Sequence, residues 1–509
     1  MIAKINRFYK LSAFIAGALS ALIFAPYFQV WLGVVAFSLL FYLSANAKSV
    51  KQAIGIGYWF GFAHFAFSFS WVGNALLIEP EKFGWLYPIT LLAAGGFFGL
   101  FVILPMWASF KLQDTIAKWL VFSGVWVISE WLRSFILTGF PWNLLGYSWA
   151  FSLPMIQNAA LGGAYLTSLA AIMFYTSGGI WLLHRNRKSF INVISAWLII
   201  IGGWYVFGNY RLNDTHLKSM NKMVRIVQPS IPQNMKWTAE QAESNFAQYL
   251  KMSFSVNRSS PDIIVWGETA SPFILDRDEE HLKQITDKLN ASATLLTGMI
   301  SYQYIDGAYR PHNSMVMISA QGGIKGYYHK SHLVPFGEYI PLRKYLPRFI
   351  QPVANAVGEF GVGNGAETFD LSDGIKLGAA ICYEIIFPHQ VVEEKRRPDF
   401  LVNLTNDGWY GDSAGPYQHW VAAKFRAIEE GISVVRAANG GISGVIDPLG
   451  REKGVLPLNV KQVSDVTLDY PLVKTTTYSW IGNQITLILC LILIGLGVIK
   501  NAMKLSNRR

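Results

Sequence analysis

The stretch Leu377-Gly378-Ala379-Ala380-Ile381-Cys382-Tyr383-Glu384 places a thiol and a carboxylate at the end of an apolar run. Such a run has the composition of a central strand in a sheet that is covered on both faces. The only other cysteine, Cys490, lies in an apolar stretch near the C-terminus, so we expect no disulfide framework. Cys382 is then either a positioned nucleophile or a small buried hydrophobe, and its neighbours alone leave both interpretations open.

Short β-branched runs alternate with longer mixed segments from about residue 210 to residue 477. The region has the composition of a soluble domain and is long enough for one sizeable core. Strands interleaved with helices predict an α/β layered domain. The expected strands are Val224–Val227, Ile263–Trp266, Ala293–Gly298, Ser314–Ser319, Ile324–Tyr328, Leu377–Cys382, Phe400–Thr405, Ser433–Ala437 and Gly444–Ile446, and the expected helices are Ala239–Ser255, Glu279–Asn290, Pro388–Lys395 and Tyr417–Gly431.

The rest of the chain is strongly apolar. Over all 509 residues, 52% are hydrophobic and 15% are charged, and the apolar excess lies outside the soluble region. A helix that crosses a hydrocarbon core of about 30 Å needs roughly 20 apolar residues. We therefore predict an all-α membrane domain with seven helices in residues 1–209, a soluble domain in residues 210–477, and an eighth helix with a basic tail in residues 478–509. The predicted spans are Leu11–Tyr27, Val30–Ala45, Ala53–Ile78, Pro88–Phe110, Trp119–Leu137, Ala159–Leu183, Phe190–Gly208 and Trp480–Ile499.

The net charge of +11 has a placement that argues against a nucleic-acid partner. Lysines and arginines gather before the first span, after the eighth, and in alternate short loops, for example at Arg185, Arg187 and Lys188. Basic residues mark cytoplasmic loops, so both termini are expected in the cytoplasm and the soluble domain on the outer side. The first span also has the features of a signal peptide, but a protein with many spans needs no separate signal, and we favour an uncleaved anchor.

Three reactive residues stand at the ends of predicted strands, where α/β folds commonly build their sites. Glu268 follows Ile263–Gly267, Lys330 follows Gly326–His329, and Cys382 follows Leu377–Ile381. Singly, Glu268 could cap a helix and Lys330 could be a solvated turn residue. Together they form a set for acyl transfer, because a thiol attacks only as a thiolate, a carboxylate can take its proton, and an ammonium group can stabilise the anions.

The residues around these three positions resemble the signatures of the nitrilase superfamily, and specifically of its membrane-anchored branch, the bacterial apolipoprotein N-acyltransferases. Further stretches are close to that branch, while Ser230 stands where the branch more often has Asn. The resemblance implies an αββα sandwich inserted between the seventh and eighth transmembrane helices. The stretches that carry it are Trp266–Thr269, Lys330–Glu338, Cys382–Glu384, Gln228–Trp237, Asn403–Gly411 and Arg436–Gly441.

The resemblance also implies a reaction in two steps without a metal or another cofactor. Cys382 takes an acyl chain from a phospholipid, and the α-amine of a diacylglyceryl-modified N-terminal cysteine on an apolipoprotein then attacks the thioester. Glu268 is the expected base and Lys330 the expected anion stabiliser. The expected supporting residues are Glu338, Tyr383 and Glu384, and the expected substrate contacts are Trp237, Phe336 and Trp409. The implied location is the bacterial inner membrane with a periplasmic catalytic domain.

Two other interpretations of the same residues stay open at this point. A membrane-tethered amidase would use the same three residues with water as the acceptor. A transporter or lipoprotein-binding scaffold would carry an inactive domain, although the spans hold few ionisable residues of the kind that transport needs. The histidines His329, His332 and His419 show no spacing typical of a metal site.

Two further features have a structural and a functional interpretation. Glu130 and Arg133 lie one helical turn apart in the fifth span, where they either pair with each other or receive a phospholipid headgroup. The segment Pro341–Gly363 reads as a long loop that either packs on the surface or dips into the bilayer interface as a lid.

Overall fold

The computed structural model describes residues 7–255, 260–305, 307–345, 347, 352, 358–371 and 373–507. The chain divides into two compact units. One unit, His216–Thr475, holds every strand of the described residues, and we call it the strand-rich unit. The other combines Met1–Thr215 with Thr476–Arg509, and we call it the helical unit.

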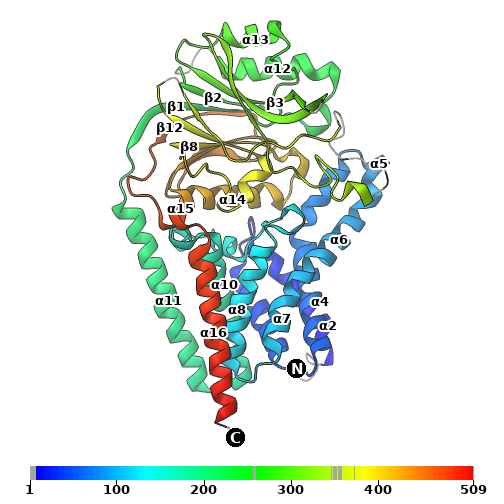
Figure 1. Ribbon diagram of the computed structural model, residues 1–509, viewed down its shortest axis with the longest axis vertical. Coiled ribbons are helices and arrows are strands. Elements are labelled where there is room, and N and C mark those ends of the chain that lie inside the picture. Colours follow the sequence, from blue (N-terminus) through cyan, green and yellow to red (C-terminus); the bar gives the residue numbers. More distant parts are fainter. Residues whose placement is uncertain are drawn as a thin grey trace. The chain divides into compact units, whose positions relative to one another are not determined.

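Two six-stranded sheets pack face to face in the strand-rich unit (Figure 1). The first sheet has the order β12-β1-β2-β3-β4-β5 and the second has the order β11-β10-β9-β8-β7-β6. In each sheet three neighbouring strands are parallel, β1, β2 and β3 or β7, β8 and β9, and the flanking strands are antiparallel. The strands are β1 Ser219–Gln228, β2 Ile263–Val265, β3 Thr294–Ile305, β4 Ala308–Ser319, β5 Gly323–His329, β6 Thr368–Asp370, β7 Lys376–Ile381, β8 Phe400–Asn406, β9 Ser433–Asn439, β10 Ser443–Ile446, β11 Glu452–Leu456 and β12 Gln462–Asp469.

Helices cover the outer face of each sheet, which gives four layers. Apolar side chains of both sheets, such as Val265 and Val402, form the core between them. A second core lies between the first sheet and the helices α12 (Ala239–Ser253) and α13 (Glu279–Thr286). Helix α14 (Ala414–Glu430) contacts the second sheet at β9 and β10 (Figure 1). Among the parallel strands, β2 and β7 are buried and nearly continuous in apolar residues, as the sequence pattern predicts.

Each of the nine expected strands overlaps an observed one. The three strands that the pattern missed are β6, β11 and β12, which are partly exposed and therefore mix polar with apolar residues. The prediction of a helix over Pro388–Lys395 is wrong. His389 has a φ of +64°, which interrupts a right-handed helix, and the carboxylate of Glu393 accepts from the backbone N–H of Thr368 at 2.9 Å.

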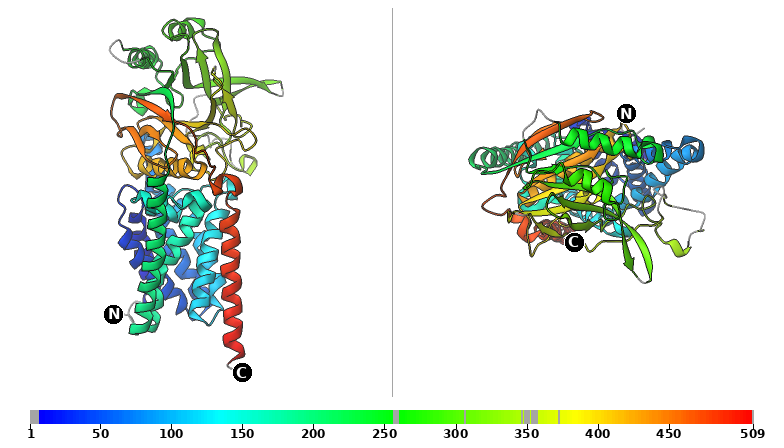
Figure 2. Two further views of the ribbon diagram at one scale, coloured as in Figure 1. Left: turned by 90° about the vertical axis from the view of Figure 1, so that its left-hand side faces the viewer. Right: turned by 90° about the horizontal axis from the view of Figure 1, so that it is seen from above.

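The helical unit contains four helices in the described residues that are long and apolar enough to cross a membrane. These are Pro80–Phe110, Ala159–His184, Arg187–Asp214 and Gln484–Ser506. Shorter apolar helices cover Tyr9–Ile23 and Val30–Ala45. Figure 2 (left) shows long helices of this unit running side by side. Its helices are α2 Tyr9–Ser20, α3 Val30–Ala45, α4 Val50–Ser68, α5 Pro80–Phe83, α6 Tyr87–Gly99, α7 Ile103–Phe110, α8 Thr115–Leu132, α9 Leu153–Ile156, α10 Ala159–His184, α11 Arg187–Asp214, α15 Thr477–Ile481 and α16 Gln484–Ser506.

Large apolar side chains on the long helices are exposed within the unit. On α11, Leu198 is 72% exposed, Ile199 75% and Val206 66%. A soluble monomer rarely leaves contiguous apolar surface of this kind in water. These helices therefore fit a hydrocarbon surrounding.

A helix lies in each of the eight segments predicted as spans, but several of the predicted boundaries are wrong. The first span was expected to reach Tyr27, whereas its helical part ends at Ile23 because Phe24 is extended. The third span was expected over Ala53–Ile78, whereas α4 ends at Ser68 because Phe69 leaves the helical region, and the 3₁₀ segment Ser70–Leu77 follows. The fifth was expected to reach Leu137, whereas α8 ends at Leu132 and Leu137 itself has a φ of +52°.

Helix α16 packs against α8 through a small residue. A Cβ atom added at Gly124 of α8 would lie 2.9 Å from the backbone oxygen of Cys490 on α16. Such close approach of backbones is typical of packed membrane helices. Cys490 is therefore a buried packing residue.

The segment Pro341–Gly363, predicted as a long loop or lid, lies partly outside the described residues. In its described part, Arg343 and Glu359 form an ion pair with 3.1 Å between Nε and Oε1. The backbone N–H of Gly363 donates to the carbonyl oxygen of Lys330 at 2.9 Å. The end of this segment is thus fixed to the loop that carries Lys330, and the lid stays a prediction.

Candidate active site

Cys382 occupies a sharp turn directly after strand β7. The chain passes from β7 into the short 3₁₀ segment Cys382–Ile386, and Cys382 has a φ of +50°, in the left-handed region. A side chain other than Gly is held there at a cost of roughly 1–3 kcal/mol, and such strain clusters at functional sites. The turn is held by His419 of α14, whose Nε2 donates to the carbonyl oxygen of Cys382 at 3.1 Å.

Glu268 follows β2 at the point where the two sheets meet. Its backbone N–H donates to the carbonyl oxygen of Thr405 on β8 at 3.3 Å, which links the first sheet to the second. The next residue, Thr269, has a φ of +44°. Gly298 lies directly against this turn, because a Cβ atom there would come within 2.3 Å of the backbone nitrogen of Thr269.

Lys330 follows β5 and lies between two carboxylates. Its Nζ is 3.3 Å from Oε1 of Glu268 and 3.0 Å from Oε1 of Glu338. Asn313 on β4 bridges the same two carboxylates, since its Nδ2 donates to Glu268 at 2.7 Å and to Glu338 at 2.9 Å. The other oxygen of Glu338 accepts from the backbone N–H of Val334 at 2.8 Å. The predicted Glu268, Lys330 and Glu338 thus share one buried network.

The charges of this network act on Cys382. Burial would raise the pKa of Glu268, but the ammonium groups of Lys330 and Lys236 outweigh it and lower that pKa below its ordinary value. Burial would lower the pKa of Lys330, but Glu338 and Glu268 raise it well above its ordinary value. Burial raises the pKa of the Cys382 thiol to about 12, and Glu268 acts in the same direction. The resting site therefore holds a neutral thiol beside a carboxylate that is ready to take its proton.

Glu384, one of the expected supporting residues, accepts hydrogen bonds through both of its carboxylate oxygens. One oxygen accepts from the backbone N–H of Ser331 and from its hydroxyl, both at 2.7 Å. The other accepts from Tyr328 at 2.8 Å and from the backbone N–H of Ile381 at 2.6 Å. Glu384 therefore joins the loop of Lys330 to the end of β7. Its neighbour Tyr383 is buried.

The three aromatic residues expected to contact substrate lie at the surface of the unit or close to it. Trp237 is 41% exposed and Phe336 is 54% exposed, while Trp409 is half-buried in the 3₁₀ segment Asp407–Tyr410. Phe336 has a φ of +60° in the loop that carries Glu338.

The structure adds residues that the sequence patterns did not single out. Lys236 and Asn313 contact Glu268 directly, and Asp407 and Arg436 form a buried ion pair with 2.7 Å between Oδ2 and Nη2. Nδ1 of His419, which the sequence offered only as a metal ligand, lies 2.9 Å from Oδ1 of Asp407. Lys236, Asp407 and Arg436 lie within stretches that resemble the family, Asn313 lies next to a predicted strand, and His419 lies within a predicted helix; that position was the only available signal.

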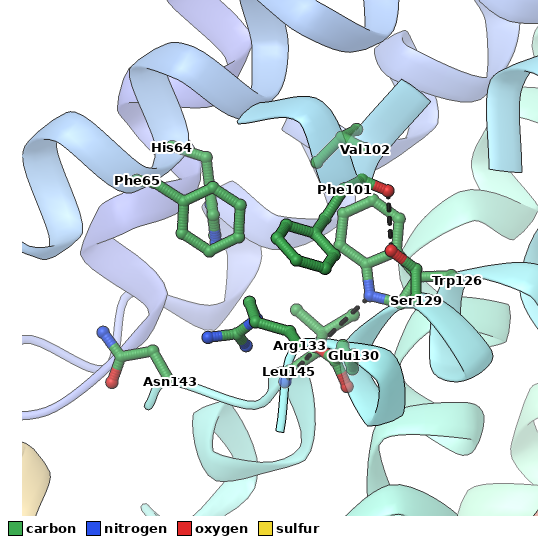
Figure 3. A pocket seen from close by; sticks show the side chains of 10 residues that line it. All are labelled: His64, Phe65, Phe101, Val102, Trp126, Ser129, Glu130, Arg133, Asn143 and Leu145. Atoms are coloured by element: carbon green, nitrogen blue, oxygen red, sulfur yellow. Dashed lines mark hydrogen bonds between the residues drawn. The ribbon is translucent and has the colours of Figure 1, made fainter. Parts of the chain in front are cut away.

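A second buried cluster of charge lines a pocket in the helical unit (Figure 3). Glu130 Oε1 accepts from the backbone N–H of Leu145 at 2.8 Å, while its other oxygen has no hydrogen-bond partner among the described residues. Arg133 Nη1 donates at 2.7 Å to each of two carbonyl oxygens, those of Phe140 and Trp142. These bonds give both residues a structural role. The alternative of headgroup binding stays a prediction.

Comparison with known proteins first defines the class. Residues 223–478 match the family model described as carbon-nitrogen hydrolase, in agreement with the two mixed sheets and the three reactive residues at their strand ends. Residues 16–177 match the model described as apolipoprotein N-acyltransferase N-terminal domain. Among solved structures, the C. elegans NitFhit protein covers 52% of this chain and 63% of its own, with 19% identity and a TM-score of 0.39.

Relatives then define the family. The apolipoprotein N-acyltransferase of Rhizobium rhizogenes is 34% identical over 500 residues, which cover 92% of this chain and 93% of the relative. The protein of the same name from Rickettsia typhi is 33% identical over 477 residues, which cover 93% of this chain and 95% of the relative. The chain belongs to the apolipoprotein N-acyltransferase family and is a membrane-anchored protein. The resemblance predicted from the motifs is confirmed.

Proposed function

We propose that this chain moves an acyl chain from a phospholipid, through a thioester on Cys382, to the α-amine of the S-diacylglyceryl N-terminal cysteine of an apolipoprotein. The observation that carries the proposal is the single buried network in which Lys330 bridges Glu268 and Glu338 beside Cys382. The names of the relatives favour this reaction over hydrolysis of small amides by the same three residues.

In the first half-reaction Glu268 takes the thiol proton while sulfur attacks the ester carbonyl carbon of the phospholipid. The oxyanion that forms is stabilised by the Lys330 ammonium group, which the adjacent carboxylates keep protonated. The carbon–oxygen bond of the ester breaks, and Glu268 returns the proton to the departing glycerol oxygen. The products are a lysophospholipid and a thioester on Cys382.

In the second half-reaction the neutral α-amine of the acceptor attacks the thioester carbonyl. Glu268 takes a proton from the new nitrogen, the carbon–sulfur bond breaks, and the same proton returns to the thiolate of Cys382. Water competes with the amine at this stage, so the thioester must be kept dry or covered by lipid until the acceptor arrives.

The other predicted site residues have assigned places in this scheme. Glu338 holds the Lys330 ammonium group, and Tyr383 and Glu384 keep the nucleophile turn in shape. Trp237, Phe336 and Trp409 offer apolar rings to the two lipid substrates. No metal or organic cofactor is part of the scheme, because proton transfer and charge stabilisation suffice for transfer between acyl esters, thioesters and amides.

We further propose eight membrane spans in the bacterial inner membrane, with residues 210–477 as a periplasmic domain between the seventh and eighth spans. Helices in all eight predicted segments and the concentration of basic residues in alternate loops support this topology. Both termini are then cytoplasmic. Labelling of single cysteines placed in the short loops, with a reagent that does not cross the membrane, tests the orientation; labelling of loops on the wrong side would overturn it.

Mass spectrometry of the intact protein tests the reaction. Purified protein in detergent, given a phospholipid of defined acyl chains, should gain the mass of one acyl group and lose it when a diacylated lipopeptide is added. Cys382→Ala should gain nothing, whereas Cys490→Ala, the matched variant of the only other cysteine, should behave as the wild type. A wild-type protein that acylates the lipopeptide without ever carrying the acyl group would overturn the thioester scheme.

A further inference from the structure

Lys236 is a buried lysine that joins the ends of two strands beside the proposed site. It follows the 3₁₀ segment Gln233–Met235 and is only 5% exposed. Its Nζ donates to the backbone carbonyl oxygen of Glu268 at 2.8 Å and to Oγ1 of Thr269 at 3.1 Å. The side-chain amide of Asn406, at the end of β8, lies 3.2 Å from Nζ and accepts a third hydrogen bond when its oxygen faces the lysine.

Two of these acceptors belong to the strained turn that aims the Glu268 side chain. Thr269 is β-branched and has a φ of +44°, a conformation that costs of order 1–3 kcal/mol and persists only where its surroundings enforce it. One ammonium group that bonds to two successive residues of this turn restricts its rotation. Lys236 therefore fixes the direction in which the Glu268 carboxylate points.

The positive charge of Lys236 also offsets the negative charges of the carboxylates at the site. Without it, Glu268 and Glu338 face the single ammonium group of Lys330, and a thiolate would have to form in an environment with an excess of negative charge. With Lys236 there are two carboxylates and two ammonium groups. A buried thiolate needs such compensation, because desolvation disfavours it strongly.

We propose that Lys236 is a positioning residue that clamps the Glu268–Thr269 turn and supplies the second positive charge that a Cys382 thiolate requires. The inference rests on the proposed function in one respect, that Cys382 is the nucleophile. It assigns a role to a lysine outside the three reactive residues predicted from the sequence.

Lys236 differs from its neighbours in the pH range over which its charge changes. Burial lowers the pKa of Lys236 to about 8, although Glu268 and Cys382 act in the opposite direction. The other shifted groups of the site have pKa values outside the range around pH 8. The pKa of Cys382 is raised to about 12 and that of Asp407 is lowered to about 2, those of Tyr410 and Lys330 are raised, and those of Glu268 and His419 are lowered.

Alkylation of Cys382 by iodoacetamide measures thiolate formation without any lipid substrate. The rate is followed in purified full-length protein by peptide mass spectrometry, which separates Cys382 from Cys490. The variants are Lys236→Met, which loses charge and donors, Lys236→Gln, which keeps donors, and Lys236→Arg, which keeps charge. Lys222→Met is the matched control, because Lys222 forms its ion pairs with Asp262 and Asp373 at 3.3 and 2.7 Å.

We expect the wild type to react about tenfold faster than Lys236→Met near pH 6.5, which corresponds to about one pKa unit at the thiol. The ratio should fall toward one above about pH 9, since the wild-type lysine has then lost its charge as well. Lys236→Arg should match the wild type at low pH and react faster than it at high pH. Lys222→Met should follow the wild type throughout.

If the ratio of the wild-type alkylation rate to that of Lys236→Met is above one but does not change with pH, Lys236 is a purely structural residue. If that ratio is one at every pH, Lys236 has neither role. Either result overturns the proposal. If thermal unfolding shows that Lys236→Met does not fold, Lys236→Gln gives the same comparison with the donors kept. The alkylation needs no phospholipid. A failure to form any thioester would therefore count against the proposed reaction. The pH dependence of the alkylation ratio would still show whether the charge of Lys236 stabilises the Cys382 thiolate.

Discussion

The two units of this chain each bury a cluster of charge, and the charged groups have different kinds of partners. In the strand-rich unit, the Lys330 ammonium group contacts the carboxylates of Glu268 and Glu338 at 3.3 and 3.0 Å. In the helical unit, the Arg133 guanidinium donates to two backbone carbonyl oxygens. Glu130 accepts from the backbone N–H of Leu145 (Figure 3).

The difference separates two uses of the same residue types. A charge that bonds to backbone groups holds a loop in place, and its partners do not change their own charge. A charge that bonds to other titratable side chains shifts their pKa values and can respond when a proton moves. Substitutions in the cluster of the strand-rich unit should therefore affect chemistry as well as stability, whereas substitutions in the cluster of the helical unit should affect stability alone.

The largest effect is expected from Lys330→Met. The variant leaves Glu268 and Glu338 without the cation between them, so the pKa of Glu268 rises and the oxyanion loses its stabilising charge. Single-turnover thioester formation should fall by at least about 10³-fold. Stability should fall by roughly 3 kcal/mol, because a buried ion pair has lost one partner.

Thioester formation is measured by intact mass after mixing with phospholipid, and stability by thermal unfolding. Lys222→Met, which removes a partly exposed lysine of the same unit, is the control and should change neither quantity appreciably. A Lys330→Met protein that still forms the thioester within about tenfold of the wild-type rate would remove the distinction between the two clusters.

The sequence predicted Glu268, Lys330 and Cys382 because each follows a predicted strand. Glu268 and Cys382 follow β2 and β7, parallel strands that are apolar and buried, whereas Lys330 follows the partly exposed, antiparallel β5. Asn313 could not be found in this way, since it lies between His312 and Ser314, just before an expected strand, and its partners are 25 and 45 residues away along the chain. The same holds for Lys236, whose partners are 32 and 33 residues away.

The fold was predictable to a similar degree and for similar reasons. The central strands β2, β7 and β8 were expected from their apolar runs, whereas the partly exposed β6, β11 and β12 show no uniform pattern. Helices in the apolar segments follow from length and composition. Their ends depend on single residues with non-helical backbone angles, such as Phe69, which hydropathy does not report.

A smaller effect, of a different kind, is expected from Glu130→Ala. The variant leaves the backbone N–H of Leu145 and the indole N–H of Trp126 without their acceptor, which should cost about 2–3 kcal/mol of stability. Thioester formation per folded molecule should stay within about threefold of the wild type. Thermal unfolding and the same single-turnover assay measure the two quantities.

The matched variant Glu130→Gln keeps an acceptor for Leu145 and should recover most of the lost stability. If Glu130→Ala instead leaves the unfolding temperature unchanged and weakens the dependence of the reaction on phospholipid concentration, the pocket binds the lipid headgroup. The charged cluster of the helical unit would then take part in binding the acyl donor, and the two clusters would not differ in the way proposed.

The smallest effect is expected from Asp407→Asn, which tests whether the strand-rich unit also contains a purely structural charge. Burial would raise the pKa of Asp407, but Arg436 and His419 lower it to about 2. Because the folded pKa lies below the ordinary value, Asp407 stabilises the fold above about pH 4, and this contribution disappears as the pH falls through about 2. The contribution is about 2 kcal/mol at neutral pH.

Asp407→Asn should lose this stability at neutral pH and should show a shallower loss than the wild type between about pH 4 and pH 2. Tryptophan fluorescence during thermal unfolding at a series of pH values measures both, since Trp266 is fully buried in this unit. Thioester formation per folded molecule should not fall, because Asp407 itself raises the pKa of Cys382 and its removal does not disfavour the thiolate. A variant with unchanged stability and a slower reaction would instead assign Asp407 a part in the chemistry of Cys382.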